Sequence, residues 1–385
     1  MIKFRKKIII VFSLILLSLL LIYLTPIDFK KLFLSNITRE KNIIYDELTI
    51  PKPEKEALKF LAKKMSGPDF SIYTNYINKE SDNSIIATGK DVLSESQGLF
   101  LLYLLNRNKK EAFDTCFNWT LDNLYLDNGL FSWIKRKDEK KEKINALIDD
   151  LRIIRTAILA SEKWNEDSYL KYIKNTSKSL LLNNTKDFTP IDFYDLNTGS
   201  KSDYITISYL DLYTMKKLIS VDSEWKEIYS SSYNILKGGK IKNTGLYKYQ
   251  YNLNDKEYTL GDNINLIQSV YAMIHLAEVG HYDKDGMNWL WEAYTKNGKL
   301  YAHYCYESFK PVSKIESTAL YSLAARLFYL AGENQKAKTL LEESEKFQII
   351  NQASKGFGSF GSENNLQIYS FDNLQYILSS SMIYK

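Results

Sequence analysis

Apolar residues recur at helical spacing in about twelve successive segments of this chain. Between them, short loops alternate with longer ones rich in Asn, Asp, Gly and Tyr. Six helical hairpins closed into an (α/α)6 barrel account for this alternation most simply, with the long loops at one end. No fixed-period self-similarity points to an open superhelix of repeats. We therefore predict an all-α barrel with helices near 53–65, 94–106, 109–124, 147–163, 166–182, 203–219, 223–236, 263–279, 284–295, 316–331, 334–348 and 370–382.

Every second predicted helix begins with an acidic residue. In a ring of hairpins these helices all start at the same face, so their carboxylates are expected to converge on one cleft. Asp is a favoured N-cap and first-turn acids complement the helix dipole, so most of the set is expected to serve as caps. The six acids are Glu95, Asp150, Asp203, Asp262, Glu316 and Asp372.

The N-terminus predicts a membrane attachment. Segment 8–24 is an almost uninterrupted apolar run, close to the roughly 17–25 residues that span a bilayer, and 1–7 is basic. We expect a cytoplasmic flank at 1–7, a transmembrane signal anchor at 8–24, a tether at 25–52 and a catalytic domain at 53–385 outside the cytoplasm. A cleaved signal peptide is the alternative, but no small-x-small pattern or lipobox cysteine follows Leu24.

Charge and ligand types exclude several classes of function. Four of the residues behind the net charge of +5 lie in 1–7, which leaves +1 for the rest and argues against a nucleic-acid surface. Cys116 and Cys305 are far apart, outside any CxxC spacing, and the three histidines form no HExxH-type cluster. We predict neither a catalytic metal nor a cofactor.

Three acidic turns carry a family resemblance. The run Ser94-Glu95-Ser96-Gln97-Gly98 resembles the Ser-Glu-Gly/Ser-x-x-Gly segment with the general acid of family 8 glycoside hydrolases. Ile148-Asp149-Asp150-Leu151 is similar to the family's Asp-x-Asp, with Asp150 at the second Asp and Ile148 in place of the first. Tyr258-Thr259-Leu260-Gly261-Asp262 is similar to the Tyr-x-x-Gly/Ser-Asp segment that carries the base. The resemblance covers roughly residues 85 to 375.

The resemblance implies an inverting mechanism with Glu95 as general acid and Asp262 as general base. Such enzymes hold the two carboxyl groups about 6.5–9.5 Å apart so that a water fits between base and sugar. Asp150 is expected to orient the sugar or the water, and Asp149 to bind substrate. A helix N-terminus lowers a carboxyl pKa, so burial against Trp133 or the neighbouring acids must raise that of Glu95.

Aromatic residues make up 14% of the chain, which suits a cleft that stacks rings on sugars. Trp133, in a polar long loop at the predicted face, is the first stacking candidate. Tyr209 is the second, by resemblance to a family Ser-Tyr, and helix packing is the alternative for it. The mixed charges of 135–143 are typical of a solvated loop rather than a polyanion site.

These features predict a membrane-anchored, extracytoplasmic endo-glycoside hydrolase acting on a β-linked exopolysaccharide or cell-surface polysaccharide. Its anchoring suggests polysaccharide synthesis machinery as a partner. One alternative is a catalytically inactive glycan-binding subunit of an export assembly, which the altered Asp-x-Asp turn favours. A less favoured alternative is a polysaccharide lyase with His303 beside Tyr304 and Tyr306.

Overall fold

The computed structural model describes residues 50–77, 88–137, 141–242 and 244–385. Chain contacts divide the protein into two units. Every element described below belongs to the second unit, Leu48–Lys385.

Most residues of the predicted membrane attachment lie outside the part of the chain that the structure describes. The flank 1–7, the anchor 8–24 and nearly all of the tether 25–52 lie outside the described ranges. Within those ranges, no helix combines the length and the apolar character that crossing a bilayer requires.

Twelve α-helices form about half of the described chain, and short strands precede several of them. Their positions agree with the helices expected from the apolar periodicity, apart from the segment discussed below. The helices are α2 (Lys52–Lys64), α3 (Ser94–Asn106), α4 (Lys110–Leu124), α5 (Leu147–Trp164), α6 (Leu170–Asn183), α7 (Leu212–Leu218), α8 (Trp225–Gly238), α9 (Leu266–Ala277), α10 (Lys284–Asn297), α11 (Thr318–Leu330), α12 (Asn334–Glu345) and α13 (Ser370–Ile383).

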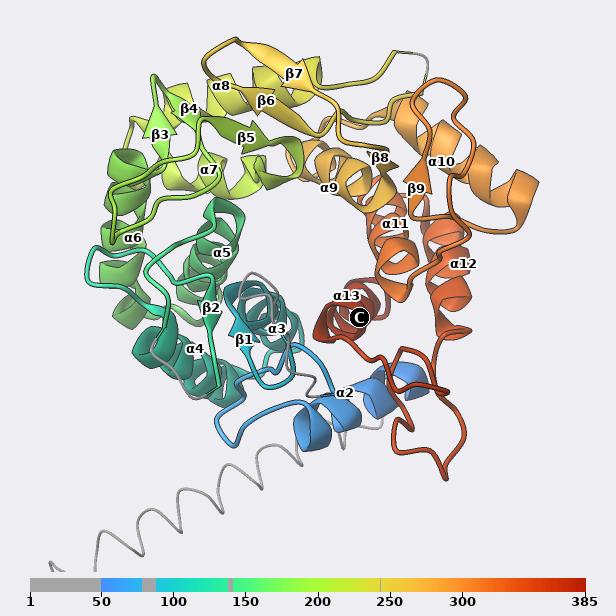
Figure 1. Ribbon diagram of the computed structural model, residues 1–385. Coiled ribbons are helices and arrows are strands. Elements are labelled where there is room, and N and C mark those ends of the chain that lie inside the picture. The colour runs from blue at the N-terminus through green and yellow to red at the C-terminus, as the bar shows by residue number, and fades with distance from the viewer. Residues whose placement is uncertain (1–49, 78–87, 138–140, 243) are drawn as a thin grey trace, which may run out of the picture. The chain divides into compact units, whose positions relative to one another are not determined.

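Six of these helices form a closed inner ring. In chain order α3, α5, α7, α9, α11 and α13 pack each against the next, and α13 returns to pack against α3. The other six, α2, α4, α6, α8, α10 and α12, lie outside them (Figure 1). This arrangement of six helical pairs is consistent with the expected (α/α)6 barrel.

Sequence composition separates the two rings. The inner helices α3 and α11 bury residues on every side, as expected for helices that are apolar all round. The outer helix α12 buries only Ala337, Leu340, Leu341 and Ser344, which form one stripe, while Lys338 and Glu342 are exposed.

A buried acid fastens the point where the ring closes. Glu54 of α2 is 0% exposed. Its carboxylate accepts hydrogen bonds from Arg107 after α3 (2.6 and 2.8 Å) and from Tyr103 of α3 (3.0 Å). It also accepts one from Ser380 of α13 (2.6 Å). The first outer helix is thus tied to both helices that meet at the closure.

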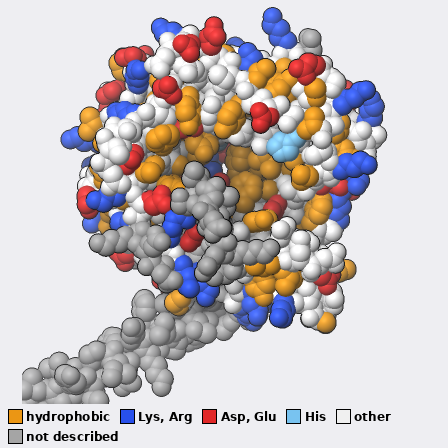
Figure 2. All heavy atoms as spheres, viewed as in Figure 1, with side chains coloured by type: hydrophobic (Ala, Val, Ile, Leu, Met, Phe, Trp, Pro, Cys, Tyr) orange, Lys and Arg blue, Asp and Glu red, His pale blue; other side chains and the backbone are white. Residues whose placement is uncertain are grey.

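Short antiparallel strands lie beside the first turns of the inner helices. They pair as β1 with β2, β3 with β4, β6 with both β5 and β7, and β8 with β9. The face drawn in Figure 2 is hollowed at the centre of the ring, and hydrophobic side chains line the hollow. The strands are β1 (Val92–Leu93), β2 (Ile134–Lys135), β3 (Thr185–Lys186), β4 (Thr189–Pro190), β5 (Tyr204–Thr206), β6 (Gln250–Asn252), β7 (Glu257–Thr259), β8 (Ile264–Asn265) and β9 (His303–Tyr304).

Two sequence expectations are wrong. The segment 203–219 is not one helix but β5, the 3-10 turn η2 (Ile207–Tyr209) and the short helix α7. Its β-branched start favours a strand, and the Asp211 side chain caps α7 by accepting from the Thr214 amide. The six helix-opening acids also do not cap their own helices, because Leu93, Ala146, Asn265, Ser317 and Tyr369 occupy the other N-cap positions.

Candidate active site

Glu95 lies in the first turn of α3, beside the loop that carries Trp133. The amide and the hydroxyl of Ser94 both donate to the carbonyl oxygen of Trp133, at 3.0 and 3.2 Å. In the same place Leu93 of β1 pairs with Ile134 of β2. The start of α3 and the Trp133 loop are therefore held together, as the sequence prediction required.

The environment of Glu95 suits a proton donor. Burial raises the pKa of its carboxyl to about 7, against the opposing charge of Arg152 and with a further contribution from Asp149. The dipole at the start of α3 favours the charged carboxylate, but the loss of solvent outweighs it. Glu95 thus keeps its proton in a large fraction of molecules at neutral pH.

Asp149 is the member of the acidic pair that lies near Glu95. One of its oxygens accepts from Arg152 (2.6 Å) and the other from Ser94 (2.8 Å). Burial raises the pKa of Asp149 despite these contacts. The hydroxyl of Ser94, the residue before Glu95, therefore links the start of α3 to Asp149 of α5.

Arg152 is a site residue that the sequence reasoning missed. Its aliphatic stem lies against Gly98, where an added Cβ would meet the Arg152 Cγ and Cδ atoms at 3.0 Å. A residue larger than glycine at position 98 would therefore displace the Arg152 side chain. In the sequence, the available signal for this contact was Gly98 of the acidic motif, because the lack of a side chain there indicates a close neighbour.

Tyr209 joins the same group of residues. It is half-buried at the end of η2. Burial raises the pKa of its hydroxyl, and the charges of Asp149, Asp192 and Glu95 raise it further. The structure therefore brings together Glu95, Asp149 and Tyr209, all three expected from the sequence.

Asp192 is a second residue that the sequence reasoning missed. It lies after β4, in a stretch expected only to be a long loop. Its two oxygens accept from the amide and the hydroxyl of Thr206, both at 2.6 Å, and burial raises its pKa to about 6. It is buried beside Tyr209 and supplies a second carboxyl with a raised pKa.

Asp150 does not face the cleft. Its side chain is 0% exposed. One oxygen accepts from the Phe131 amide and the other from the Asn145 side chain, both at 2.6 Å. Successive helical residues point about 100° apart, so Asp149 and Asp150 face different surroundings. This corrects the expected contact of Asp150 with sugar or water, and gives it the role of fixing the loop beside Glu95.

Asp262 is exposed in the loop that leads into β8 and α9. It lies before an inner helix, as Glu95 lies in the first turn of one, so both belong to the same end of the ring. Among the described residues, no hydrogen bond or ion pair joins Asp262 to Glu95, Asp149 or Tyr209. Its proposed partnership with Glu95 therefore rests on its place in the fold.

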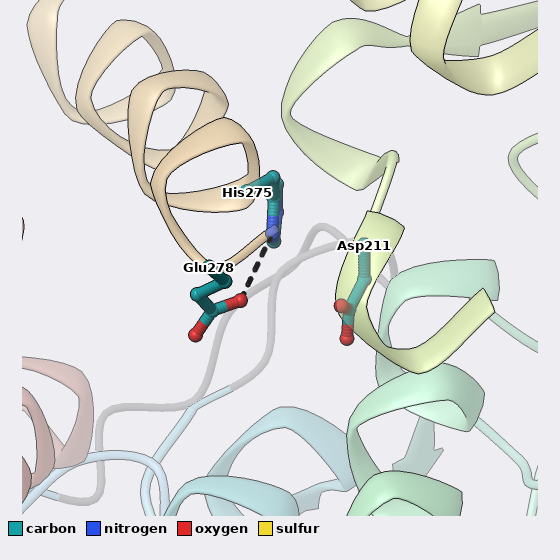
Figure 3. A group of neighbouring side chains, drawn as sticks. All are labelled: Asp211, His275 and Glu278. Carbon is teal, nitrogen blue, oxygen red and sulfur yellow. Dashed lines mark ion pairs between the residues drawn. The ribbon is translucent and has the colours of Figure 1, made fainter. Parts of the chain in front are cut away.

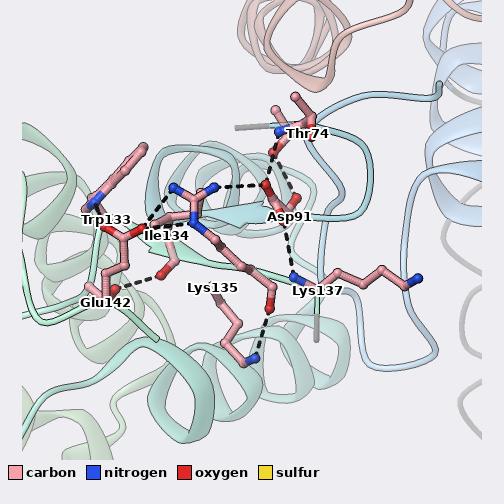
Figure 4. A network of polar contacts seen from close by, with 10 residues as sticks. Thr74, Asp91, Trp133, Ile134, Lys135, Lys137 and Glu142 are labelled. Atoms are coloured by element: carbon pink, nitrogen blue, oxygen red, sulfur yellow. Dashed lines mark hydrogen bonds and ion pairs between the residues drawn. The ribbon is translucent and has the colours of Figure 1, made fainter. Parts of the chain in front are cut away.

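Trp133 belongs to a network of polar contacts (Figure 4). Its indole N–H donates to Glu142 (2.8 Å), and the guanidinium of Arg136 lies 5.9 Å from its ring centroid. Arg136 also contacts Glu142 (2.9 Å) and Asp91 (3.4 Å). The part of the 135–143 run that is described thus forms ion pairs that position Trp133.

Three side chains of the kinds that bind metals lie close together where α7 begins and α9 ends. Ligand atoms of Asp211, His275 and Glu278 all lie within 4.8 Å of one another (Figure 3). Both Glu278 oxygens, however, accept from Arg155 (2.7 and 2.9 Å), which also lies 3.7 Å from Asp211. Because the guanidinium already balances these acids and would repel a cation, the group fits an ion-pair network better than a metal centre.

The two tyrosines of the lyase alternative, Tyr304 and Tyr306, each contact a residue other than His303. Tyr304 is 1% exposed and packs edge-on against Trp289, at 5.0 Å between ring centroids. The Tyr306 hydroxyl accepts from the Gly261 amide (3.2 Å). Neither tyrosine is placed to act with His303 as a catalytic pair.

Comparison with known proteins identifies relatives that match most of this chain. Residues 73–296 match the model of the family described as "Glycosyl hydrolases family 8". "Putative lipoprotein YdaJ" of Bacillus subtilis (strain 168) is 30% identical over 331 residues, which are 84% of this chain and 88% of that protein.

Two solved structures are similar in fold. A structure described as a novel alpha-amylase from Clostridium perfringens is 35% identical, with a TM-score of 0.81, over 86% of this chain and 97% of that one. PssZ from Listeria monocytogenes is 20% identical, with a TM-score of 0.66, over 84% of this chain and 93% of that one. At that lower identity the second similarity shows the fold alone.

Proposed function

Because this chain belongs to family 8 of the glycosyl hydrolases, we propose that it cleaves internal bonds of a polysaccharide with inversion at the anomeric carbon. Its class, a glycoside hydrolase, follows from that membership. The observation that supports the mechanism best is the half-buried Glu95, whose pKa is raised to about 7.

In the proposed reaction Glu95 protonates the glycosidic oxygen as its bond to the anomeric carbon breaks. A water attacks that carbon from the opposite face and gives its proton to Asp262. An exposed position suits a base that must receive water, and the two carboxyl groups would lie about 6.5–9.5 Å apart with substrate bound.

The remaining site residues support the general acid. Asp149 adds negative charge near Glu95, which favours the protonated carboxyl. Arg152 holds Asp149 in place at 2.6 Å. Tyr209 and Trp133 supply aromatic surfaces for sugar rings, because ring faces stack on the apolar faces of pyranoses.

The substrate proposed first is a β-linked exopolysaccharide or cell-surface polysaccharide, as the family resemblance implies. A specific observation favours a second class, α-linked glucan. The Clostridium perfringens structure, at 35% identity and a TM-score of 0.81, is described as an alpha-amylase. The two classes differ in the configuration of the bond that the site must accept.

An extracytoplasmic location completes the proposal. The apolar segment 8–24 follows a basic flank, which favours a single membrane anchor with the barrel outside the cytoplasm. The Bacillus subtilis relative carries the name of a lipoprotein, which agrees with a surface location. An enzyme held there would meet polysaccharide as the cell's synthesis machinery exports it.

The test combines a substrate panel with NMR of the first-formed products. The full-length protein in mild detergent is incubated with β-1,4-glucan, chitosan, xylan, soluble starch and the cell's own exopolysaccharide, beside Glu95→Gln. Inversion releases α-anomers from β-linked substrates and β-anomers from starch, and the Gln variant should release neither. Products that retain the anomeric form of the cleaved bond would refute the mechanism.

The glycan-binding alternative gives a different pattern. The altered turn at Ile148 is the observation that favours it. A wild-type protein that binds one of these polysaccharides but cleaves none, with equal binding by Glu95→Gln, would replace the enzyme proposal with this one.

A further inference from the structure

A cavity of about 120 Å³ lies on the axis of the ring, between α3, α5, α9, α11 and α13. Hydrophobic residues such as Leu378 and Met382 form part of its wall. Charged side chains form much of the rest. These are Arg152, Arg155, Arg326, Asp211 and Glu278.

Two of the three arginines are paired with acids. Arg155 donates two hydrogen bonds to Glu278, at 2.7 and 2.9 Å. Arg152 donates to Asp149 at 2.6 Å. The charges of these guanidinium groups are therefore largely balanced within the protein.

Asp211 is held away from the third arginine. Its oxygens accept from the amide (3.0 Å) and the hydroxyl (2.5 Å) of Thr214 at the start of α7. Its nearest cation is Arg155, at 3.7 Å. The carboxylate therefore serves α7 and Arg155.

Arg326 is the arginine without an acidic partner. It is 6% exposed, and no carboxylate oxygen of the described residues lies within 4.0 Å of it. Its Nη2 donates to Gln375 (3.0 Å), and its Nε has no hydrogen-bond partner among the described residues. Burial lowers the pKa of the guanidinium. Tyr271 and Glu278 oppose this effect, while Arg155 and Arg152 add to it, and the pKa stays below its usual value. A buried cation in this state is costly unless an anion balances it.

We propose that this cavity binds a small monovalent anion of the chloride type against Arg326. The cavity exceeds the roughly 30 Å³ that a water occupies, so it admits a small ion with a few waters but no sugar ring. The nearby Arg155 contributes a second Nε without a hydrogen-bond partner in the described chain. A metal cation is disfavoured here, since three guanidinium groups border the space.

The first test measures thermal unfolding at constant ionic strength. Full-length protein in mild detergent is unfolded in sodium gluconate, whose anion is too large for the cavity, while chloride replaces gluconate stepwise. A ligand of the folded state at a hundredfold excess over its dissociation constant should raise the midpoint by about 4 °C, with saturation. Equal midpoints in chloride and gluconate would overturn the proposal.

Variants locate the effect. Arg326→Gln should lose the chloride-dependent rise, and in gluconate it should unfold no earlier than wild type, because it removes an unbalanced buried charge. Arg136→Gln makes the same substitution outside the cavity and should keep the full rise. A full chloride response in Arg326→Gln would contradict the site.

If Arg326→Gln does not fold, crystallography of the wild-type protein tests directly whether an anion binds in the cavity. Crystals of the wild-type protein grown in sodium bromide should show an anomalous peak in the cavity, within contact distance of the Arg326 guanidinium. Bromide bound only at surface positions would refute the assignment. Neither measurement uses catalysis, so failure here is distinguishable from failure of the proposed hydrolysis.

Discussion

Replacing Glu95 by Gln should make the protein more stable at alkaline pH while it removes activity. The substitution keeps the shape of the side chain but removes a carboxyl whose pKa is raised to about 7 by desolvation. Wild-type protein must bury a carboxylate when Glu95 ionises, whereas the variant never does. The two proteins should therefore diverge as the pH rises.

The size of the effect follows from the pKa of Glu95, which rises from 4.5 to about 7 on folding. Above pH 4.5 the unfolded chain loses this proton before the folded protein does, so wild-type stability falls until about pH 7. Each pKa unit corresponds to about 1.4 kcal/mol, so the loss is about 3 kcal/mol. Glu95→Gln avoids that loss.

The assay is guanidinium unfolding of both proteins at intervals from pH 4 to pH 8.5. The difference in free energy of unfolding should be near zero at pH 4 and about 3 kcal/mol above pH 8, in favour of Gln. Activity of the variant should fall by about 10²–10⁴, the usual contribution of a general acid.

An exposed glutamate of the outer helix α10 provides the control. Glu292→Gln makes the same chemical change outside the site and should show no such pH-dependent difference. A flat difference between wild type and Glu95→Gln across the range would mean that Glu95 is ionised in the folded protein at neutral pH. The general-acid assignment would then lose its physical basis.

Three further substitutions test the surroundings. Asp149→Asn removes a charge that favours the protonated general acid, so the alkaline limb of kcat/KM should move to lower pH; an unmoved limb would argue against their coupling. Glu278→Gln leaves Arg155 without its buried partner and should cost about 3–5 kcal/mol in urea unfolding, and a loss below 1 kcal/mol would show a weak pair. Gly98→Ala pushes on the Arg152 stem at 3.0 Å, so kcat/KM should fall with the fold retained by circular dichroism, and unchanged kinetics would show that the stem moves freely.

The helices could be predicted because apolar spacing indicates burial, either along one face of an outer helix such as α12 or on every side of an inner helix such as α3. The strands of two or three residues could not, since they are too short to show a pattern of their own and several depend on a partner loop distant in sequence, as β1 depends on β2. The segment 203–219 failed for a local reason. Its start favours a strand, and Asp211 begins a new helix inside the expected one.

Sequence motifs pointed to some residues of the candidate site, but not to those whose place in it depends on packing. Glu95, Asp149 and Tyr209 lie together, as expected. The roles of Asp149 and Asp150 were less well separated, because the rotation of α5 about its axis decides which of two adjacent residues faces the cleft. Arg152 resembles any helical arginine in sequence, and only its contact with Gly98 distinguishes it.

The closure of the ring by α13 determines when the protein can finish folding. Ser370 and Ser381 of α13 bond to Ser96 and Asn106 of α3, each at 3.0 Å, across more than 270 positions of sequence. The first inner helix therefore waits for a neighbour that is synthesised more than 250 residues later. Such a late, long-range contact slows folding. The ring can therefore close only once α13 is available, however early the other inner helices form.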